Sequence, residues 1–174
     1  SFAGSVDNST IIAMGSSIHT QHSYIFAFTL VGLVSFSGVA SRTDVVFERN
    51  VVVRVGGQPA TISLFGRLSH TTVTVRHNVV RQVSTARTSA HVLDFEGGLH
   101  QVTVEVLNLT CENVATIPRT LFLADVVRSV IGVTDLKQES RNGDLCQVVM
   151  FNQQLMDSTG LIHNSSFYCS GWEG

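Results

Sequence analysis

Hydrophobic and polar residues alternate in short runs along much of the chain. Val73 and Val75 are separated by Thr74, and the segment VTVEV at 102–106 has the same pattern. A period of two residues is typical of β-strands with one buried face. No repeat copy contains ten residues with helical spacing, so the pattern predicts an all-β protein.

The alternating pattern is itself repeated. The segment VSFSGVASRTDVVFERNVVVRV (34–55) aligns without a gap with ISLFGRLSHTTVTVRHNVVRQV (62–83), and nine of the 22 positions are identical. The identities include non-apolar positions: Ser35 with Ser63, Gly38 with Gly66, Ser41 with Ser69, Thr43 with Thr71 and Asn50 with Asn78. A shared apolar pattern does not explain these identities, so the chain contains a sequence repeat whose step in residue number is 28.

Weaker copies follow at similar spacing. The Val-Thr-Val of residues 73–75 recurs from Val102 at an offset of 29, and Asn108 follows Asn78 by 30. Steps of 28 relate Leu93 and Phe95 to Leu121 and Leu123, then to Val149 and Phe151, and relate Gly132 and Val133 to Gly160 and Leu161. At least five copies follow residue 34, and the segment 1–33 is long enough for one more irregular copy.

The length of the repeat selects among repeat architectures. A propeller blade needs about 40 residues for its four strands, and arrays of helical repeats need helical spacing. Three short strands and three turns fit the observed period if the chain winds around a parallel β-helix, whose coils stack at about 4.8 Å. We therefore predict a right-handed parallel β-helix of about six coils of ~28 residues, with residues 1–174 in a single segment.

Stacked coils place equivalent residues directly above one another. Asn50, Asn78 and Asn108 recur at nearly one period, and side-chain amides in such a column can hydrogen-bond from coil to coil. The alternative is that each asparagine only tolerates left-handed backbone at a turn. The spacing favours an asparagine ladder.

Composition agrees with extended structure and argues against one class of partner. Hydrophobic residues make up 44% of the chain and charged residues 14%, below the roughly 25% charge of ordinary soluble domains. The net charge is −2 and the arginines are scattered. The sequence therefore does not predict a nucleic-acid-binding surface.

One long apolar segment without charge is YIFAFTLVGLVSFSGVA (Tyr24–Ala40). It is slightly shorter than a membrane helix, which needs about 20 residues, and its second half aligns with a more polar part of the next copy. A strand and a membrane segment are the alternatives here, and the repeat favours the strand. We expect membrane contact only through a region outside residues 1–174. The start of the chain lacks the basic region of a signal peptide.

Three cysteines, Cys111, Cys146 and Cys169, have neither the spacing of a zinc site nor the number of a disulfide scaffold. The spacing of Cys146 and Cys169 is close to one repeat. They are the pair that we expect if the chain forms a disulfide.

Three asparagines begin N-glycosylation sequons: Asn8 in NST, Asn108 in NLT and Asn164 in NSS. The sequons agree with a secreted origin. A glycan on Asn108 requires an outward-facing side chain, which conflicts with a place in an inward-facing ladder.

The segments VTVRHNVV, VTVEVLNLT, LDFEGGL and LFLADVV resemble the degenerate Val-rich and Asn-rich copies of a known family. That family is the right-handed parallel β-helix surface proteins of trypanosomatids known as the dispersed gene family. The resemblance covers most of the chain. It implies a glycosylated cell-surface protein with an adhesive role toward matrix or host cells, of which this chain would be a segment.

Parallel β-helices also carry polysaccharide lyases and hydrolases, whose sites collect acids from stacked strands. Steps of 28 pair Asp44 with Thr72, Glu48 with Arg76, Asp125 with Gly97 and Gln153, and Asp135 with His163. No such column holds two acids. The histidines of HTQH, His19 and His22, would point to opposite faces of a strand and do not suit a metal site.

The sequence thus predicts an extracellular or cell-surface segment that binds carbohydrate or a matrix or host-surface ligand. It predicts no catalytic residue, metal or cofactor. A polysaccharide-active enzyme on the same scaffold and a purely structural spacer are the alternatives.

Overall fold

The computed structural model describes residues 5–15, 17–21, 34–36, 39–55, 60–64, 66–82, 91–95, 97–114, 120–122, 125–140, 149–151 and 153–169. These residues form 23 β-strands and no helix, so the described part of the chain is all-β, as the alternating pattern predicts. Over the same ranges there is accordingly no apolar helix long enough to cross a membrane.

The apolar segment 24–40 is described only in part. Its residues 34–36 form β4 (Val34–Phe36), and Ala40 begins β5 (Ala40–Ser41). Residues 24–33, 37 and 38 lie outside the described part of the chain, so the choice between strand and membrane segment is answered as strand only for β4 and β5.

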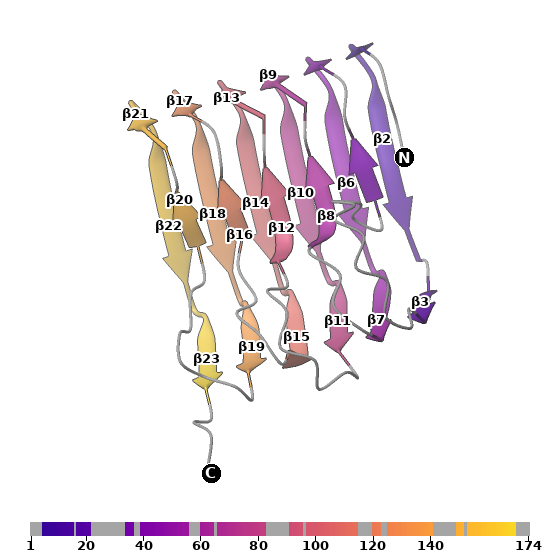
Figure 1. The fold of residues 1–174 in the computed structure, drawn as a ribbon. Coiled ribbons are helices and arrows are strands. Elements are labelled where there is room, and N and C mark those ends of the chain that lie inside the picture. Colours follow the sequence, from indigo (N-terminus) through magenta and orange to yellow (C-terminus); the bar gives the residue numbers. More distant parts are fainter. Residues whose placement is uncertain are drawn as a thin grey trace.

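The strands form four parallel sheets, which we name the short, main, side and back sheets (Figure 1). The short sheet contains β1 (Val6–Asp7), β5, β9 (Leu68–Ser69), β13 (Leu99–His100), β17 (Val126–Val127) and β21 (Leu155–Met156). The main sheet contains β2 (Thr10–Met14), β6 (Asp44–Glu48), β10 (Thr72–Arg76), β14 (Thr103–Leu107), β18 (Val130–Thr134) and β22 (Thr159–His163).

The other two sheets continue the same order. The side sheet contains β3 (Ser17–Gln21), β7 (Val51–Val55), β11 (Val79–Gln82), β15 (Thr110–Val114), β19 (Lys137–Ser140) and β23 (Ser166–Cys169). The back sheet contains β4, β8 (Ala60–Leu64), β12 (His91–Phe95), β16 (Thr120–Phe122) and β20 (Val149–Phe151). Each sheet therefore takes every fourth strand.

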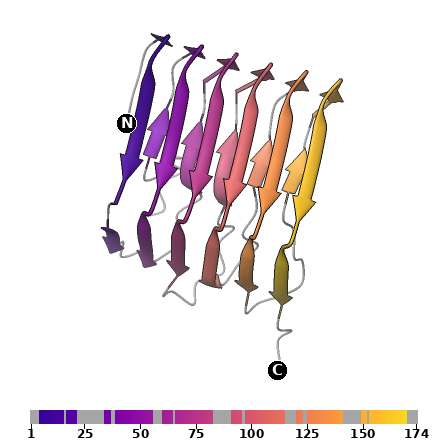
Figure 2. The ribbon, with the colours of Figure 1, turned by 180° about the vertical axis from the view of Figure 1, so that it is seen from behind.

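Four consecutive strands make one layer, from β1–β4 in layer one to β21–β23 in layer six. Figures 1 and 2 show the layers following one another in chain order along one direction, with the marks N and C at opposite ends of the row. Sequence repeats thus correspond to layers, and neighbouring layers are joined by parallel pairing within each sheet.

The register gives the true length of each repeat. Paired residues across the main sheet are Ile11, Val45, Val73, Val104, Ile131 and Gly160. Subtracting each of these residue numbers from the next gives steps of 34, 28, 31, 27 and 29. In the main sheet, the predicted step of 28 is therefore correct only between layers two and three. In the back sheet the same step relates β4 to β8, and the ungapped alignment covers both of these pairings.

Three predicted correspondences need correction as a result. Val73 pairs with Val104 and not with Val102, and Leu93 pairs with Thr120 and not with Leu121. Leu161 pairs with Gly132, whereas it was expected opposite Val133. The first error is a shift of two residues, which keeps the face of the strand. The other two are shifts of one residue, which exchange the two faces of a strand.

All the variation in repeat length falls in one connection. This connection runs from a side-sheet strand to the next back-sheet strand, and we measure it between residues that are equivalent in the register. Its length is 17, 11, 14, 10 and 12 residues in layers one to five. The measured pairs are Ser17 to Val34, Val51 to Ile62, Val79 to Leu93, Thr110 to Thr120 and Lys137 to Val149. The other three connections keep a constant length in all layers that contain them, for example five residues from Ala40 to Val45 and from Leu155 to Gly160.

The core lies on one face of the main sheet. Alternate residues of β6, β10, β14 and β18 are buried, and they are Val45, Phe47, Val73, Val75, Val104, Val106, Ile131 and Val133. Valine and isoleucine suit the pleated surface of a strand, and burying each such side chain stabilises the fold by about 1.5–3 kcal/mol. Ala40, Leu68, Leu99 and Val126 of the short sheet add to the same cluster.

Two bends flank each main-sheet strand, and both use left-handed backbone. The first bend has positive φ at Asn8, Arg42, His70, Gln101, Arg128 and Asp157. The second bend has it at Gly15, Arg49, His77, Asn108, Asp135 and Asn164. This conformation costs most residues about 1–2 kcal/mol, and asparagine and aspartate tolerate it better than most because their side chains bond locally.

The residue after the first bend supplies a hydroxyl column. In Ser9, Thr43, Thr71, Ser129 and Ser158, the hydroxyl donates to the carbonyl two residues earlier, at 2.7–2.9 Å. Ser129 Oγ also accepts the Val102 N–H at 3.1 Å, and Ser158 Oγ accepts the Ser129 N–H at 2.9 Å. One side chain thus satisfies backbone groups of two layers.

Candidate functional site

The second bend carries the asparagine ladder in layers two and three. The Asn50 N–H and its Nδ2 both donate to Oδ1 of Asn78, at 2.9 and 3.0 Å. Asn50 Nδ2 also donates to the Ala13 carbonyl, and Asn78 Nδ2 donates to the carbonyls of Phe47 and Arg76. Both asparagines are buried, so the two amides join layers one to three.

Asn108 does not belong to this ladder. It pairs in register with His77, one residue before the ladder position, which Leu109 occupies in layer four. Asn108 is exposed, has a φ of 49° and lies 3.0 Å from His77 Nδ1 through its Nδ2. The expected spacing of 30 placed it one residue out, because the true step from Val73 to Val104 is 31.

The three sequon asparagines share one backbone conformation. Asn8, Asn108 and Asn164 are all exposed, and each has a φ of 46–49° at a bend. The conflict between a ladder role and a sequon at Asn108 is thus removed, because its amide faces outward. Asn8 is on the first bend at the start of the stack, and the other two are on the second bend in layers four and six.

A cluster of charged residues lies beside the ladder, and we name Glu48, Arg49, Arg76 and His77 the arginine cluster. Arg76 Nη2 donates to Glu48 Oε2 at 2.7 Å, and Arg49 Nε lies 3.3 Å from Glu48 Oε1. The side chain of Glu48 is only 8% exposed, whereas Arg49 is 69% and Arg76 45% exposed. The hydrogen bond from Arg76 holds the pKa of the Glu48 carboxyl below its ordinary value of 4.5.

The cluster offers hydrogen-bond donors to solvent. A guanidinium has five N–H donors, and each arginine uses one contact on Glu48, so most donors of both remain available within the described part of the chain. His77 is exposed, and its Nδ1 lies within hydrogen-bond distance of Asn108 Nδ2. When Nδ1 accepts from this amide, Nε2 carries the proton and is a further donor. One buried acid between two arginines leaves a net positive charge at this bend.

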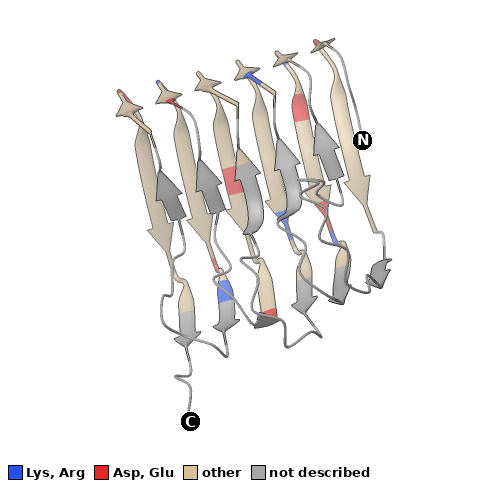
Figure 3. Cartoon of the chain, viewed as in Figure 1, with Lys and Arg blue, Asp and Glu red and all other residues tan. Residues whose placement is uncertain are grey.

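Hydroxyl groups extend the cluster over the outer face of the main sheet. Thr72 and Thr74 of β10 and Thr103 of β14 alternate with the buried valines and are half-buried. Thr72 pairs in register with Thr103. Figure 3 shows few charged residues on the described strands away from the bends, but acids do lie on β6 and β14. There, Asp44 pairs with Thr72 and Glu105 pairs with Thr74.

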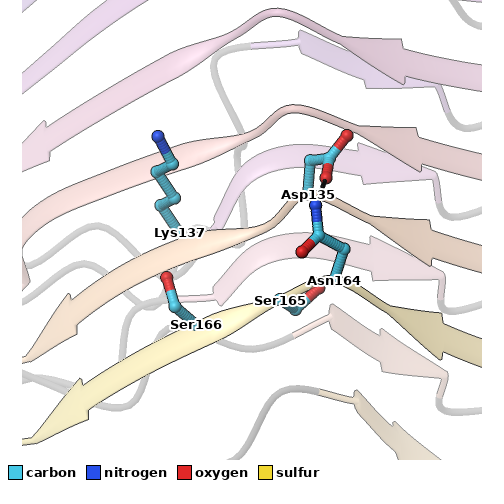
Figure 4. Close-up of a pocket in the computed structure, with 5 residues that line it drawn as sticks. All are labelled: Asp135, Lys137, Asn164, Ser165 and Ser166. Atoms are coloured by element: carbon cyan, nitrogen blue, oxygen red, sulfur yellow. Dashed lines mark hydrogen bonds between the residues drawn. The ribbon is translucent and has the colours of Figure 1, made fainter.

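A second polar feature lies on the same bend in layers five and six. Asp135, Lys137, Asn164, Ser165 and Ser166 line a shallow, open hollow of about 350 Å³. Asn164 Nδ2 donates to Asp135 Oδ1, and Figure 4 shows Lys137 beside Ser166 on the neighbouring strand. The acid is already bonded to the amide, and the hollow is open to solvent.

Another ion pair belongs to the first bend. Arg42 Nε donates to Asp7 Oδ1 at 3.0 Å, and Arg42 Nη2 contacts Asp7 Oδ2. The Arg42 hydrogen bond lowers the pKa of Asp7. Both side chains are at least half exposed, so this pair joins layers one and two with a small contribution to stability.

The described acids, histidines and cysteines lie apart from one another or in pairs. The described residues contain no group of three or more His, Cys, Asp or Glu side chains arranged to hold a metal ion. His70 and His100 lie edge to face at 6.0 Å between ring centres. Buried Cys111 is a free thiol whose pKa burial raises to about 12, so it is unreactive at neutral pH.

Several predicted positions lie outside the described residues. His22 and Cys146 belong to this group, and the side chains of His19 and Cys169 in β3 and β23 are not described. The predicted Cys146–Cys169 disulfide therefore stays a prediction. The register does correct two predicted acid columns: Asp135 lies opposite Asn164, and Asp125 lies opposite Gln154.

Comparison of the chain with models of protein families, with curated proteins and with solved structures gives no significant match in any of the three. The resemblance to trypanosomatid surface proteins stays a prediction.

Sequence reasoning paired Glu48 with Arg76 and Arg49 with His77, as positions that differ between copies and would therefore carry any binding specificity. The register of Glu48 with Arg76 is correct, but the sequence did not predict that Glu48 is buried. The burial of Glu48 is what turns the pair into an anchored group, and burial of a charged residue at the end of a strand has no signature in the sequence.

Proposed function

We propose that the chain winds as a right-handed parallel β-helix. The order of strands supports this, because each of the four parallel sheets takes every fourth strand and each layer therefore returns the chain to its starting sheet. The right hand follows from the strong preference of parallel strand crossovers for that hand.

We propose further that this β-helix is a cell-surface or secreted binding module for carbohydrate, and that the arginine cluster is its ligand site. The observation that carries the proposal is the pair of exposed guanidinium groups anchored on the buried Glu48 carboxylate. The anchor reduces the side-chain freedom that binding would otherwise remove.

The chemistry of the cluster selects acidic carbohydrate. Arginine matches carboxylate and sulfate groups with paired N–H donors, and the neighbouring threonines can bond to sugar hydroxyls. The site is a bend beside an extended sheet face rather than a deep pocket, which suits a segment of a polymer more than a small molecule.

The sequons complete the proposal. We propose that Asn8, Asn108 and Asn164 carry glycans, because each amide is exposed at a bend. A glycan on Asn108 would lie next to His77 and so beside the arginine cluster. Glycosylation there would restrict the size of the ligand that reaches the cluster.

The test is binding of the chain, secreted from a eukaryotic host, to a uronate-rich polysaccharide and to a neutral one. We expect binding to the acidic polymer alone, weakening with added salt because the contacts are charged and exposed. Mass spectrometry of the same sample reads whether the three asparagines carry glycans.

A matched pair of variants locates the site. Arg49→Asn removes one guanidinium at a bend, and Arg128→Asn makes the same change at the other bend, where φ is also positive. Loss of one charged hydrogen bond costs about 1.5–3 kcal/mol, so Arg49→Asn should weaken binding about tenfold or more and Arg128→Asn should not. Equal effects, or no binding by the parent chain, would contradict the proposal, and the second result would favour the structural spacer.

A further inference from the structure

Exposed apolar residues concentrate at the two ends of the stack. Nine large apolar residues are exposed among the described residues, and six of them belong to layer one or layer six: Ile12, Met14, Leu155, Met156, Leu161 and Ile162. Ile162 is 50% exposed and Leu155 is 44% exposed, whereas their register partners Val133 and Val126 are each 1% exposed. These side chains are core residues of the last layer with one side uncovered.

The first layer has the shape to cover the last one. Continuing the register by one layer would place Ile11 opposite Gly160, Ala13 opposite Ile162 and Val6 opposite Leu155. In the first two pairs, a large side chain meets a small one, as close packing requires. Each first-layer residue is partly buried and already packs against the core.

The outer face matches as well. The same register would bring Leu161, which is 60% exposed, opposite Ile12, which is 57% exposed. At the bends, Asp157 would meet Asn8 and Asn164 would meet Gly15, so no two like charges come into direct register. Four of the six exposed apolar side chains, Ile12, Leu155, Leu161 and Ile162, would thus face an apolar residue across one contact. Met14 would face His163, and Met156 would face Asp7.

Backbone hydrogen bonding also continues across the contact. Inside the stack, the Ser129 N–H donates to Ser158 Oγ and the Thr159 N–H donates to the Ser129 carbonyl. Ser9 stands at the equivalent place in layer one, makes the same bond to the carbonyl two residues earlier, and gives its carbonyl to the Asp44 N–H. A first layer placed on layer six would therefore offer Ser9 Oγ to the Ser158 N–H and the Thr10 N–H to the Ser158 carbonyl.

We propose that copies of this chain associate head to tail, with β1 and β2 of one copy pairing in parallel with β21 and β22 of another. Edge strands with free backbone groups are templates for such pairing. The two contact surfaces differ, so the association is heterologous and each added copy leaves a new surface of the same kind. The product is an open filament and not a closed dimer.

The experiment measures mass against concentration by light scattering after size-exclusion chromatography, with chain produced without glycans. We expect the average mass of the parent chain to rise with concentration past that of a dimer. A monomer at all concentrations, or a mass that stops at two chains, overturns the proposal.

Two variants block opposite surfaces. Ile162→Lys places a charge where the contact is apolar, at a position half exposed in the single chain. Thr10→Pro removes the N–H that would donate across the contact, and proline is tolerated at the start of an edge strand. Each variant alone should be monomeric with the strand-rich circular dichroism spectrum of the parent.

Mixing the two variants gives the decisive outcome. Thr10→Pro keeps the last-layer surface and Ile162→Lys keeps the first-layer surface, so the mixture should form a complex that stops at one copy of each. The control is Val130→Lys, which changes a residue 52% exposed on the outer face in layer five and should associate as the parent does. A mixture that stays monomeric, or a control that is also blocked, overturns the head-to-tail contact.

Discussion

Layers two and three make the second bend with different side chains from layers four and five. In the earlier pair, Asn50 and Asn78 follow the bend, and their amides bond to each other and to three carbonyls. In the later pair, Leu109 and Leu136 take that position and are buried in the core. The backbone bends alike in both, with positive φ at Arg49, His77, Asn108 and Asp135.

The bend therefore has the same backbone conformation whichever side chain follows it, and that side chain can stabilise the stack in two ways. An amide can supply hydrogen bonds between layers, or a leucine can add apolar burial. The two solutions are separate, because an amide without its partner leaves buried polar groups unpaired. Most of the hydrogen bonds at this bend depend on the side chain of Asn78.

Asn78→Leu should have the largest effect. The variant removes an acceptor for the Asn50 N–H and Nδ2 and the donor to the Phe47 and Arg76 carbonyls. We expect the free energy of unfolding to fall by about 2–3 kcal/mol, since buried groups lose their partners while leucine itself fits this bend in layer four. Urea denaturation measures the change.

The control for that variant is the double replacement Asn50→Leu with Asn78→Leu. Removing both partners leaves fewer unpaired groups, so the double variant should cost less than the sum of the single ones by about 1 kcal/mol. Strict additivity, or a loss of only a few tenths for Asn78→Leu alone, would mean that the amide contact contributes nothing.

Ser129→Ala should have an intermediate effect. The hydroxyl donates to the Val127 carbonyl and accepts the Val102 N–H, and Ser129 is 2% exposed. We expect a loss of about 1 kcal/mol in thermal or chemical denaturation. Thr43→Val, which keeps the shape of the side chain at the same column in layer two, provides the comparison, and an unchanged stability for Ser129→Ala would show that the hydroxyl column is not needed.

Glu48→Gln should have the smallest effect, visible as pH dependence. The arginines lower the pKa of Glu48 below 4.5, so its favourable contribution is present at neutral pH and is lost as the pH falls below that value through the lower folded pKa. The variant should therefore lose less stability than the parent between about pH 6 and about pH 3. Asp7 titrates in both chains, and identical pH profiles would contradict a role for Glu48.

The sequence predicted the parts of the structure that depend on strong local repetition. The alternation in 72–76 predicted the strand β10, and the ungapped alignment predicted the true register of Glu48 on Arg76 and of Asn50 on Asn78. Later registers failed because the repeat length changes from one layer to the next, as the pairs Val73–Val104, Val104–Ile131 and Ile131–Gly160 show. A constant period of 28 residues cannot follow these changes in repeat length. Asn108 was therefore expected in the column of Asn78, although it pairs with His77.

A local signal at the bends could have fixed these registers. The hydroxyl residues Thr43, Thr71, Ser129 and Ser158 each follow a first-bend residue and precede the main-sheet strand of the same layer. Arginine and histidine at three of those bends conceal the signal, since neither residue is typical of left-handed backbone. The buried anchor of the arginine cluster was missed for another reason: the burial of Glu48 depends on packing between layers.

The single variable connection has a practical consequence. Insertions between a side-sheet strand and the next back-sheet strand account for the difference between the longest layer and the shortest, and they leave every other pairing in place. Foreign peptides added at this side would be displayed at regular intervals along the molecule without disturbing the core.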